Sequence, residues 1–278
     1  MVSAALAECG AAARTWNSGF VPVTGGRLAY HRTGGTGPAV VLSHGLTDNG
    51  LCWTRLAAAL AGEFDVVMLD ARGHGDSTRM PDGEAPDPGL DLAEAIAALG
   101  LTSPIMMGHS VGARASASFV AANPGRAARV VLEDPPLPPP ADRSETAARR
   151  ARFRRHLEDL QVLSGREILA LGRTQSPGWH EEEFSAWVLG KQQADPAALP
   201  EFAVPWQQDF AMIDVPTLLI RGEPERGGMV TPDLAAEAEA VNPRIRVVHI
   251  ECAGHNVRRE NFPAYLAAVR GFLHNHDH

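Results

Sequence analysis

Cysteine is scarce in this chain of 278 residues, which contains only Cys9, Cys52 and Cys252. Three cysteines cannot complete a set of disulfides, and no two of them have the C-x-x-C spacing of a redox or zinc motif. We therefore expect reduced cysteines, no disulfide scaffold and no metal site.

Long apolar runs are also missing. No stretch reaches the roughly 18 residues that a membrane-spanning helix needs. Residues 1–10 include Glu8 and have no basic segment ahead of their apolar residues, so they do not resemble a secretory signal. The sequence predicts a cytoplasmic protein that does not bind a membrane.

Positive charge is in deficit, because 25 Lys and Arg residues face 33 Asp and Glu residues, for a formal net charge of -8. An acidic protein is repelled by nucleic acid and by anionic membrane surfaces. We expect the partner to be a small neutral or mildly polar molecule. The oligomeric state stays open, a homodimer included.

The remaining composition is typical of a globular protein, with 45% hydrophobic and 21% charged residues. This length supports one large core with an insertion. The high content of Ala, Gly, Pro and Arg is typical of a GC-rich bacterial coding sequence.

Short apolar runs alternate with helix-like segments along most of the chain. Continuous apolar strands separated by helices predict a parallel sheet covered on both faces. Before the first of them, two short runs flank Thr24-Gly25-Gly26, which predicts an antiparallel hairpin at the start of the sheet. The predicted strands are residues 20–23, 28–31, 39–42, 65–69, 105–107, 129–132, 217–220 and 245–250, and the predicted helices lie near residues 54–60, 90–99, 111–122, 234–240 and 263–272.

The alternation is interrupted after a proline-rich run at residues 135–140. We predict a core domain of residues 1–136 and 213–278 and a helical cap, residues 137–212, inserted after the sixth strand. The cap carries Trp179, Trp187 and Trp206. We expect some of this aromatic surface to line a substrate pocket. The alternative is that these side chains form a small core of the cap itself.

The most informative motif is Gly108-His109-Ser110-Val111-Gly112, which follows an apolar run and precedes a helical pattern. A G-x-S-x-G segment between a strand and a helix is typical of a nucleophile elbow, a sharp turn that presents the central serine. Glycines on either side give the strained turn room. Ser110 is therefore the candidate nucleophile.

A serine hydroxyl needs a general base, which in turn needs an orienting group. Among the eleven histidines, His255 follows the last predicted strand directly, in Gly254-His255-Asn256. That places it at the carboxyl edge of the parallel sheet, where active sites of such sheets lie. His255 is the candidate base.

Another part of the site follows the first parallel strand. In Ser43-His44-Gly45-Leu46, the glycine permits a tight turn that can direct the Leu46 amide toward the elbow. Together with the Val111 amide it would form an oxyanion hole. His44 is a candidate substrate-binding residue. We expect Arg72 and Asp76, in the next polar turn, to stabilise loops by ion pairs.

With these motifs the chain resembles the α/β-hydrolase fold superfamily over nearly its whole length, in the serine-nucleophile branch that carries a cap. The resemblance implies an eight-stranded, mostly parallel sheet flanked by helices, with no cofactor. It also implies hydrolysis of an ester, lactone, thioester, amide or carbon–carbon bond through an acyl-serine or a related tetrahedral intermediate. The serine at the elbow argues against the branches that use an aspartate nucleophile.

The acid of the triad departs from the usual pattern of the family. The usual place, after the seventh strand, offers Glu225, but the loop has extra residues and no Asp. A minority of the family carries the acid after the sixth strand, where Asp134 stands. The sequence favours Asp134 and leaves Glu225 open.

We expect a serine hydrolase that cleaves an ester or lactone of a hydrophobic small molecule. One alternative is a hydrolase of carbon–carbon bonds in vinylogous diketones. Another is a non-hydrolytic member of the fold, that is, a lyase, a cyclase or a ligand receptor.

Overall fold

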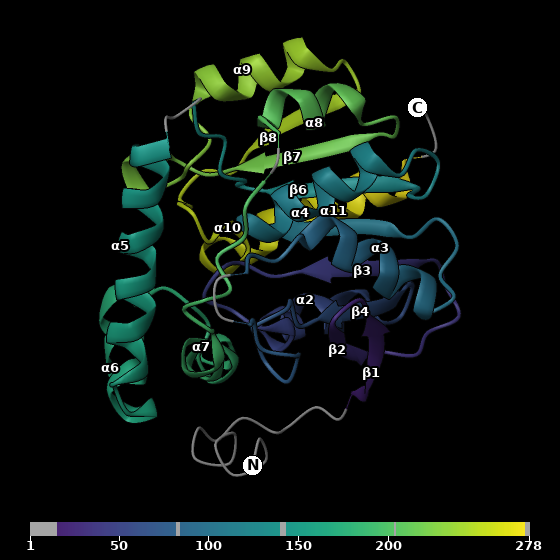
Figure 1. The fold of residues 1–278 in the computed structure, drawn as a ribbon. Helices are drawn as coiled ribbons and strands as arrows, with labels where there is room; N and C mark the ends of the chain where they lie inside the picture. Colours follow the sequence, from purple (N-terminus) through teal and green to yellow (C-terminus); the bar gives the residue numbers. More distant parts are fainter. Residues whose placement is uncertain (1–15, 82–83, 140–142, 203, 276–278) are drawn as a thin grey trace.

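The computed structural model of the protein describes residues 16–81, 84–139, 143–202 and 204–275 (Figure 1). Its centre is a sheet of eight strands in the order β1-β2-β4-β3-β5-β6-β7-β8. The pairs β1/β2 and β2/β4 are antiparallel and the other neighbours are parallel. The strands are β1 (Asn17–Val23), β2 (Gly26–Arg32), β3 (Ala39–Ser43), β4 (Asp65–Leu69), β5 (Ile105–His109), β6 (Arg129–Glu133), β7 (Thr217–Arg221) and β8 (Ile245–His249).

The prediction of a mostly parallel sheet with an antiparallel start is confirmed. Central strands such as β4 are buried at every position, because both faces of the sheet are covered by helices. One apolar core lies under α3 (Pro88–Ala98), α4 (Val111–Ala122), α8 (Trp206–Met212) and α9 (Pro232–Val241). The core on the opposite face lies under η1 (Gly50–Trp53), α2 (Thr54–Leu60) and α11 (Phe262–His274).

Three helices between β6 and β7 stand apart from the sheet: α5 (Arg143–Gln161), α6 (Gly165–Gln175) and α7 (Glu182–Gln193). We call them the inserted helices. In Figure 1 the arrowheads of β3 and β7 point toward them. The insertion therefore lies at the carboxyl edge of the sheet.

The end of the insertion differs from the prediction, which extended it to residue 212. Helix α8 packs against α4, and Trp206 and Phe210 are buried in the core beneath it. Arg114 of α4 also forms a buried ion pair with Asp209, at 2.9 Å. The chain thus rejoins the core at α8, because its apolar face completes the layer that covers the sheet.

The structure also shows the state of the cysteines and the character of the helices. Cys52 is buried and Cys252 is exposed, both as free thiols, while Cys9 lies outside the described residues. None of the described helices is long and apolar enough to cross a bilayer.

The elbow glycines are required by close backbone contacts. A Cβ atom at Gly108 would lie 2.3 Å from the Gly112 carbonyl oxygen, whereas one at Gly271, on the exposed face of α11, would meet nothing within 4 Å.

We expect Gly108→Ala to lower the free energy of unfolding by about 2 kcal/mol or more, because the backbone must shift. Gly271→Ala should raise it by about 0.5–1 kcal/mol. Urea unfolding of both variants tests this, and equal stabilities would contradict it.

Candidate active site

Ser110 occupies the sharp turn between β5 and α4. Its φ of 54° and ψ of -123° are a strained combination for a residue with a side chain. The Ser110 amide donates to the Glu133 carbonyl oxygen at 2.9 Å, which fixes the turn against the end of β6. Its side chain makes no capping hydrogen bond with α4, so the hydroxyl remains available for chemistry.

His255 follows β8 and faces Asp134, which follows β6. The His255 Nδ1 atom lies 2.7 Å from Asp134 Oδ2. The fully buried carboxylate also accepts hydrogen bonds from the Met229 and Val230 amides, at 2.8 and 3.0 Å. A carboxylate can only accept, so Nδ1 carries the proton and Nε2 is left as the acceptor that a general base needs.

Glu225, the other candidate acid, lies in η2 (Pro224–Arg226) with an exposed side chain. The structure brings Asp134 and not Glu225 to His255. The loop after β7 contributes through its backbone instead, because the Met229 and Val230 amides belong to it. This loop therefore holds the carboxylate that stands on the neighbouring strand.

His109 links the serine turn to the histidine loop. Its Nε2 atom donates to the His255 carbonyl oxygen at 2.9 Å, and the centres of the two rings are 4.7 Å apart. Burial, with smaller contributions from the Arg258 and His255 charges, holds the pKa of His109 well below its usual value. His109, which directly precedes Ser110, is therefore neutral and joins the serine turn to the loop of the candidate base.

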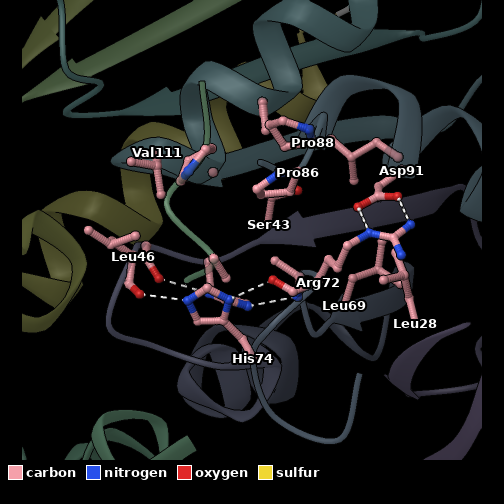
Figure 2. Close-up of a pocket in the computed structure, with 18 residues that line it drawn as sticks. Leu28, Ser43, Leu46, Leu69, Arg72, His74, Pro86, Pro88, Asp91 and Val111 are labelled. Carbon is pink, nitrogen blue, oxygen red and sulfur yellow. Dashed lines mark hydrogen bonds and ion pairs between the residues drawn. The ribbon is translucent and has the colours of Figure 1, made fainter. Parts of the chain in front are cut away.

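Residues 44–49, which we call the oxyanion loop, pass directly beside the elbow. A Cβ atom at Gly45 would lie 3.6 Å from the Ser110 Cβ atom. The Asp48 amide donates to the Gly45 carbonyl at 3.0 Å, and His74 Nε2 lies 2.7 Å from the Leu46 carbonyl (Figure 2). Among the described residues the Leu46 and Val111 amides have no acceptor. Both N–H groups are free to bind an oxyanion.

His44 orders this loop through its ring. The Ala71 amide donates to its Nε2 atom at 2.9 Å, so Nδ1 carries the proton and donates to the Gly45 carbonyl at 2.8 Å. Burial, aided by the neighbouring His74 charge, lowers the pKa of His44 to about 3. The ring is therefore neutral near pH 7.

A pocket begins at the oxyanion loop and extends under α3 and α4 (Figure 2). The volume of the pocket that the centre of a water-sized sphere can occupy is about 60 Å³. Arg72 and Asp91 meet in its wall at 2.5 and 3.0 Å and neutralise each other, whereas the buried Ser43 Oγ atom, also in the wall, has no hydrogen-bond partner among the described residues. The pocket is lined by Leu28, Ser43, His44, Gly45, Leu46, Leu69, Ala71, Arg72, His74, Pro86, Pro88, Asp91, Leu92, Val111, Gly112, Ala115, Ala198 and Pro200.

Several predictions for this region need correction. Trp179 and Trp187 pack with Phe184 in a small core of the inserted helices, and Trp206 lies in the main core, so none of the three lines this pocket. The insertion contributes Ala198 and Pro200 to the lining instead.

The expected ion pairing of the Arg72 turn is also partly wrong. Arg72 pairs with Asp91 on α3 and not with Asp76. The Asp76 side chain is exposed, and its amide donates to Asp70 Oδ2 at 2.9 Å. Asp70, rather than Asp76, therefore orders this turn.

A family model of the alpha/beta hydrolase family matches residues 40–269. The chain belongs to this family. It is 30% identical over 274 residues to N-formylmaleamate deformylase of Pseudomonas putida, covering 92% of this chain and 96% of that protein. It is 28% identical over 262 residues to 2-(acetamidomethylene)succinate hydrolase of Mesorhizobium japonicum, covering 89% and 92%.

The fold has the same relatives among solved structures. The structure of E-2-(acetamidomethylene)succinate hydrolase superposes with a TM-score of 0.78 at 22% identity, over 94% of this chain and all of that one. The alpha/beta hydrolase fold and the assignment as a hydrolase are thus confirmed.

This alpha/beta hydrolase also has a buried ionic network that the sequence interpretation missed. Asp48, in the oxyanion loop, lies 3.0 Å from Arg259 and 3.4 Å from both Arg258 and Lys191. Desolvation alone would raise the pKa of Asp48, but the three cations hold it well below its usual value. The other two carboxylates of the network are Glu133 and Glu183.

The network surrounds the candidate catalytic groups in the sequence. Arg258 and Arg259 lie in α10 (Val257–Glu260), three and four residues after His255, and Glu133 directly precedes Asp134. Two adjacent arginines after the candidate base, and Lys191 as the only lysine of the chain, were the signals available in the sequence. Neither signal specifies which residues meet.

Buried histidines predict acid sensitivity. Burial lowers the pKa of His44, His74 and His109 in the folded protein. In the unfolded chain they take up protons below their ordinary pKa of 6.5. The unfolded state therefore binds more protons between pH 6.5 and about 3, and the free energy of unfolding should fall as the pH is lowered through that window.

The expected slope is about 1.4 kcal/mol per pH unit for each proton by which the two states differ. Urea unfolding between pH 7 and 5 measures it. His44→Gln should reduce the slope, while His156→Gln, at an exposed position, should leave it unchanged. An unchanged slope in His44→Gln would contradict this account.

Proposed function

We propose that this hydrolase cleaves the N-acyl bond of a small molecule through an acyl intermediate on Ser110. The observation that carries the proposal is the 2.7 Å contact between His255 and Asp134, together with the 2.9 Å hydrogen bond by which His109 joins the strained turn of Ser110 to the His255 loop. The names of the two relatives that match over most of their length support the choice of bond, because each describes a small compound with an acylated nitrogen. They favour this chemistry over the vinylogous diketone and over a lactone.

The chemical steps follow from the placement of these groups. His255 Nε2 takes the proton of Ser110 Oγ as the oxygen attacks the acyl carbon. The Leu46 and Val111 amides stabilise the oxyanion, and Asp134 stabilises the imidazolium that forms. The intermediate collapses as the C–N bond breaks, and His255 gives its proton to the departing nitrogen. Water, activated by His255, then releases the acid and regenerates Ser110.

Substitution of the three polar groups tests this scheme. Ser110→Ala should lower kcat by about 10⁴-fold or more, and Asp134→Asn by about 10³- to 10⁴-fold, because the imidazole tautomer is lost. Glu225→Gln, the matched control at the exposed acid, should stay near the wild type. The measurement is turnover of N-formylmaleamate, 2-(acetamidomethylene)succinate and p-nitrophenyl acetate by variants whose folding is verified by circular dichroism.

Each outcome has a distinct meaning. Turnover retained in Ser110→Ala would overturn the acyl-serine mechanism. Loss in Glu225→Gln with activity kept in Asp134→Asn would overturn the assignment of the acid. Ester turnover without hydrolysis of either N-acyl compound would restrict the proposal to the ester chemistry first expected.

If this pocket holds the acyl group of the substrate, its volume limits the length of that group. Its volume of about 60 Å³ corresponds to a few water molecules, since one water needs about 10–15 Å³ by this measure. We expect kcat/KM to fall from p-nitrophenyl acetate and butyrate to the octanoate. Ala115 lies in the wall, and Ala115→Leu should narrow the preference to the acetate. A preference of the wild type for the octanoate ester would contradict the assignment of this pocket as the site of the acyl group.

A further inference from the structure

Lys191 is buried in a place that a lysine rarely occupies. Lys191 is the only lysine of the chain, and 5% of its surface is exposed to solvent. From α7 its ammonium group donates to the Thr47 carbonyl at 3.0 Å and to Thr47 Oγ1 at 2.6 Å, and it lies 3.4 Å from Asp48 Oδ1. All of these partners belong to the oxyanion loop.

Three further contacts join the insertion to the same loop, the first of them a hydrogen bond from Asn49 Nδ2 to Gln193 Oε1 at 2.9 Å. The Leu46 side chain packs with Leu157, Ala194 and Leu199 of the insertion. A Cβ atom at Gly190 would lie 3.0 Å from the Asp48 Cα atom, so α7 approaches this backbone as closely as a glycine permits. The insertion therefore contacts the loop through the Lys191 ammonium group, through a side-chain hydrogen bond, through apolar side chains and through the backbone of α7.

The contacts hold successive carbonyl groups of the loop. His74 lies against the Leu46 carbonyl and Lys191 against the Thr47 carbonyl. Because peptide groups are planar, holding the Thr47 oxygen also fixes the direction of the Asp48 N–H, which donates to the Gly45 carbonyl at 3.0 Å. The Gly45 carbonyl shares its peptide plane with the Leu46 N–H, so the contact of Lys191 restricts the direction of the Leu46 amide through this hydrogen bond. Arg259, four residues after His255, reaches Asp48 from the other side at 3.0 Å.

We propose that Lys191 is a positioning residue for the oxyanion hole, so that the Leu46 amide is correctly directed only when α7 is seated on the core. The inference rests on the proposed function, since it takes Ser110 as the nucleophile and the Leu46 amide as an oxyanion donor. The insertion then contributes to the chemical step through α7 as well as to the pocket wall through Ala198 and Pro200.

The rival explanation is that Lys191 merely attaches the insertion to the core. Arg55 provides a matched control, because from α2 it pairs with two residues of the same helix α7, Glu182 at 3.1 Å and Glu183 at 3.7 Å, and within the described residues neither pair involves the oxyanion loop. Lys191→Met and Arg55→Met each remove one cation that joins α7 to the core. Only the first releases the Thr47 carbonyl.

The kinetic test compares kcat and KM for p-nitrophenyl acetate. We expect Lys191→Met to lower kcat by about 10- to 100-fold with little change in KM, less than the loss of a whole oxyanion donor because the amide is displaced and not removed. Lys191→Arg should restore most of kcat, and Arg55→Met should leave kcat near the wild type. If Lys191→Met does not fold, Thr47→Val removes the Oγ1 contact and should give a smaller fall in kcat.

A second test needs no variant of Lys191. Because the chain has one lysine, protein labelled with ¹⁵N-lysine gives one side-chain and one backbone signal, both from Lys191. Propylboronic acid should form a tetrahedral adduct on Ser110 whose oxygen occupies the oxyanion hole. We expect both Lys191 signals to shift when the adduct forms, and no shift in Ser110→Ala.

The outcomes separate this inference from the function beneath it. Equal kcat in Lys191→Met and wild type, equal losses in Lys191→Met and Arg55→Met, or an adduct that leaves the Lys191 signals in place would overturn the role of Lys191 alone. No turnover and no adduct in the wild type would overturn the serine mechanism, and the role of Lys191 with it.

Discussion

The close approach of the α4 N-terminus to the end of β3 is the constraint on which the site depends. A Cβ atom at Gly112 would lie 2.3 Å from the Ser43 carbonyl, so only glycine permits this contact. It forces the chain to turn at Ser110 with a positive φ, and it brings the Val111 amide beside the oxyanion loop. Strain at one residue is maintained because strands on both sides fix the ends of the turn.

Around that contact the molecule places six buried charges. Removing Asp48, Lys191 or Arg259 from water is costly, and a buried ion pair adds little net stability compared with apolar packing. Such a network instead restricts which arrangements of its segments are stable, since a displaced segment would leave an unpaired charge. The segments in question are the oxyanion loop, α10 after His255 and the inserted helix α7.

The loop after β7 illustrates how a catalytic position can move between strands. Its Glu225 is exposed, yet its Met229 and Val230 amides donate to Asp134 at the end of the neighbouring strand. Because adjacent parallel strands end at the same edge, a carboxylate on either one can reach the histidine. The backbone of the loop stabilises the charge in place of a side chain.

The sequence by itself determined the sheet, its hairpin start and the turn at Ser110, because apolar runs, glycine spacing and strand–helix alternation are local signals. It also placed His255 at the correct edge. Only the tertiary structure decided that Asp134 contacts this histidine, that Trp206 belongs to the core, and that Lys191 reaches Thr47. Those contacts join residues more than 90 positions apart, and their geometry depends on how separate layers pack, which no local pattern encodes.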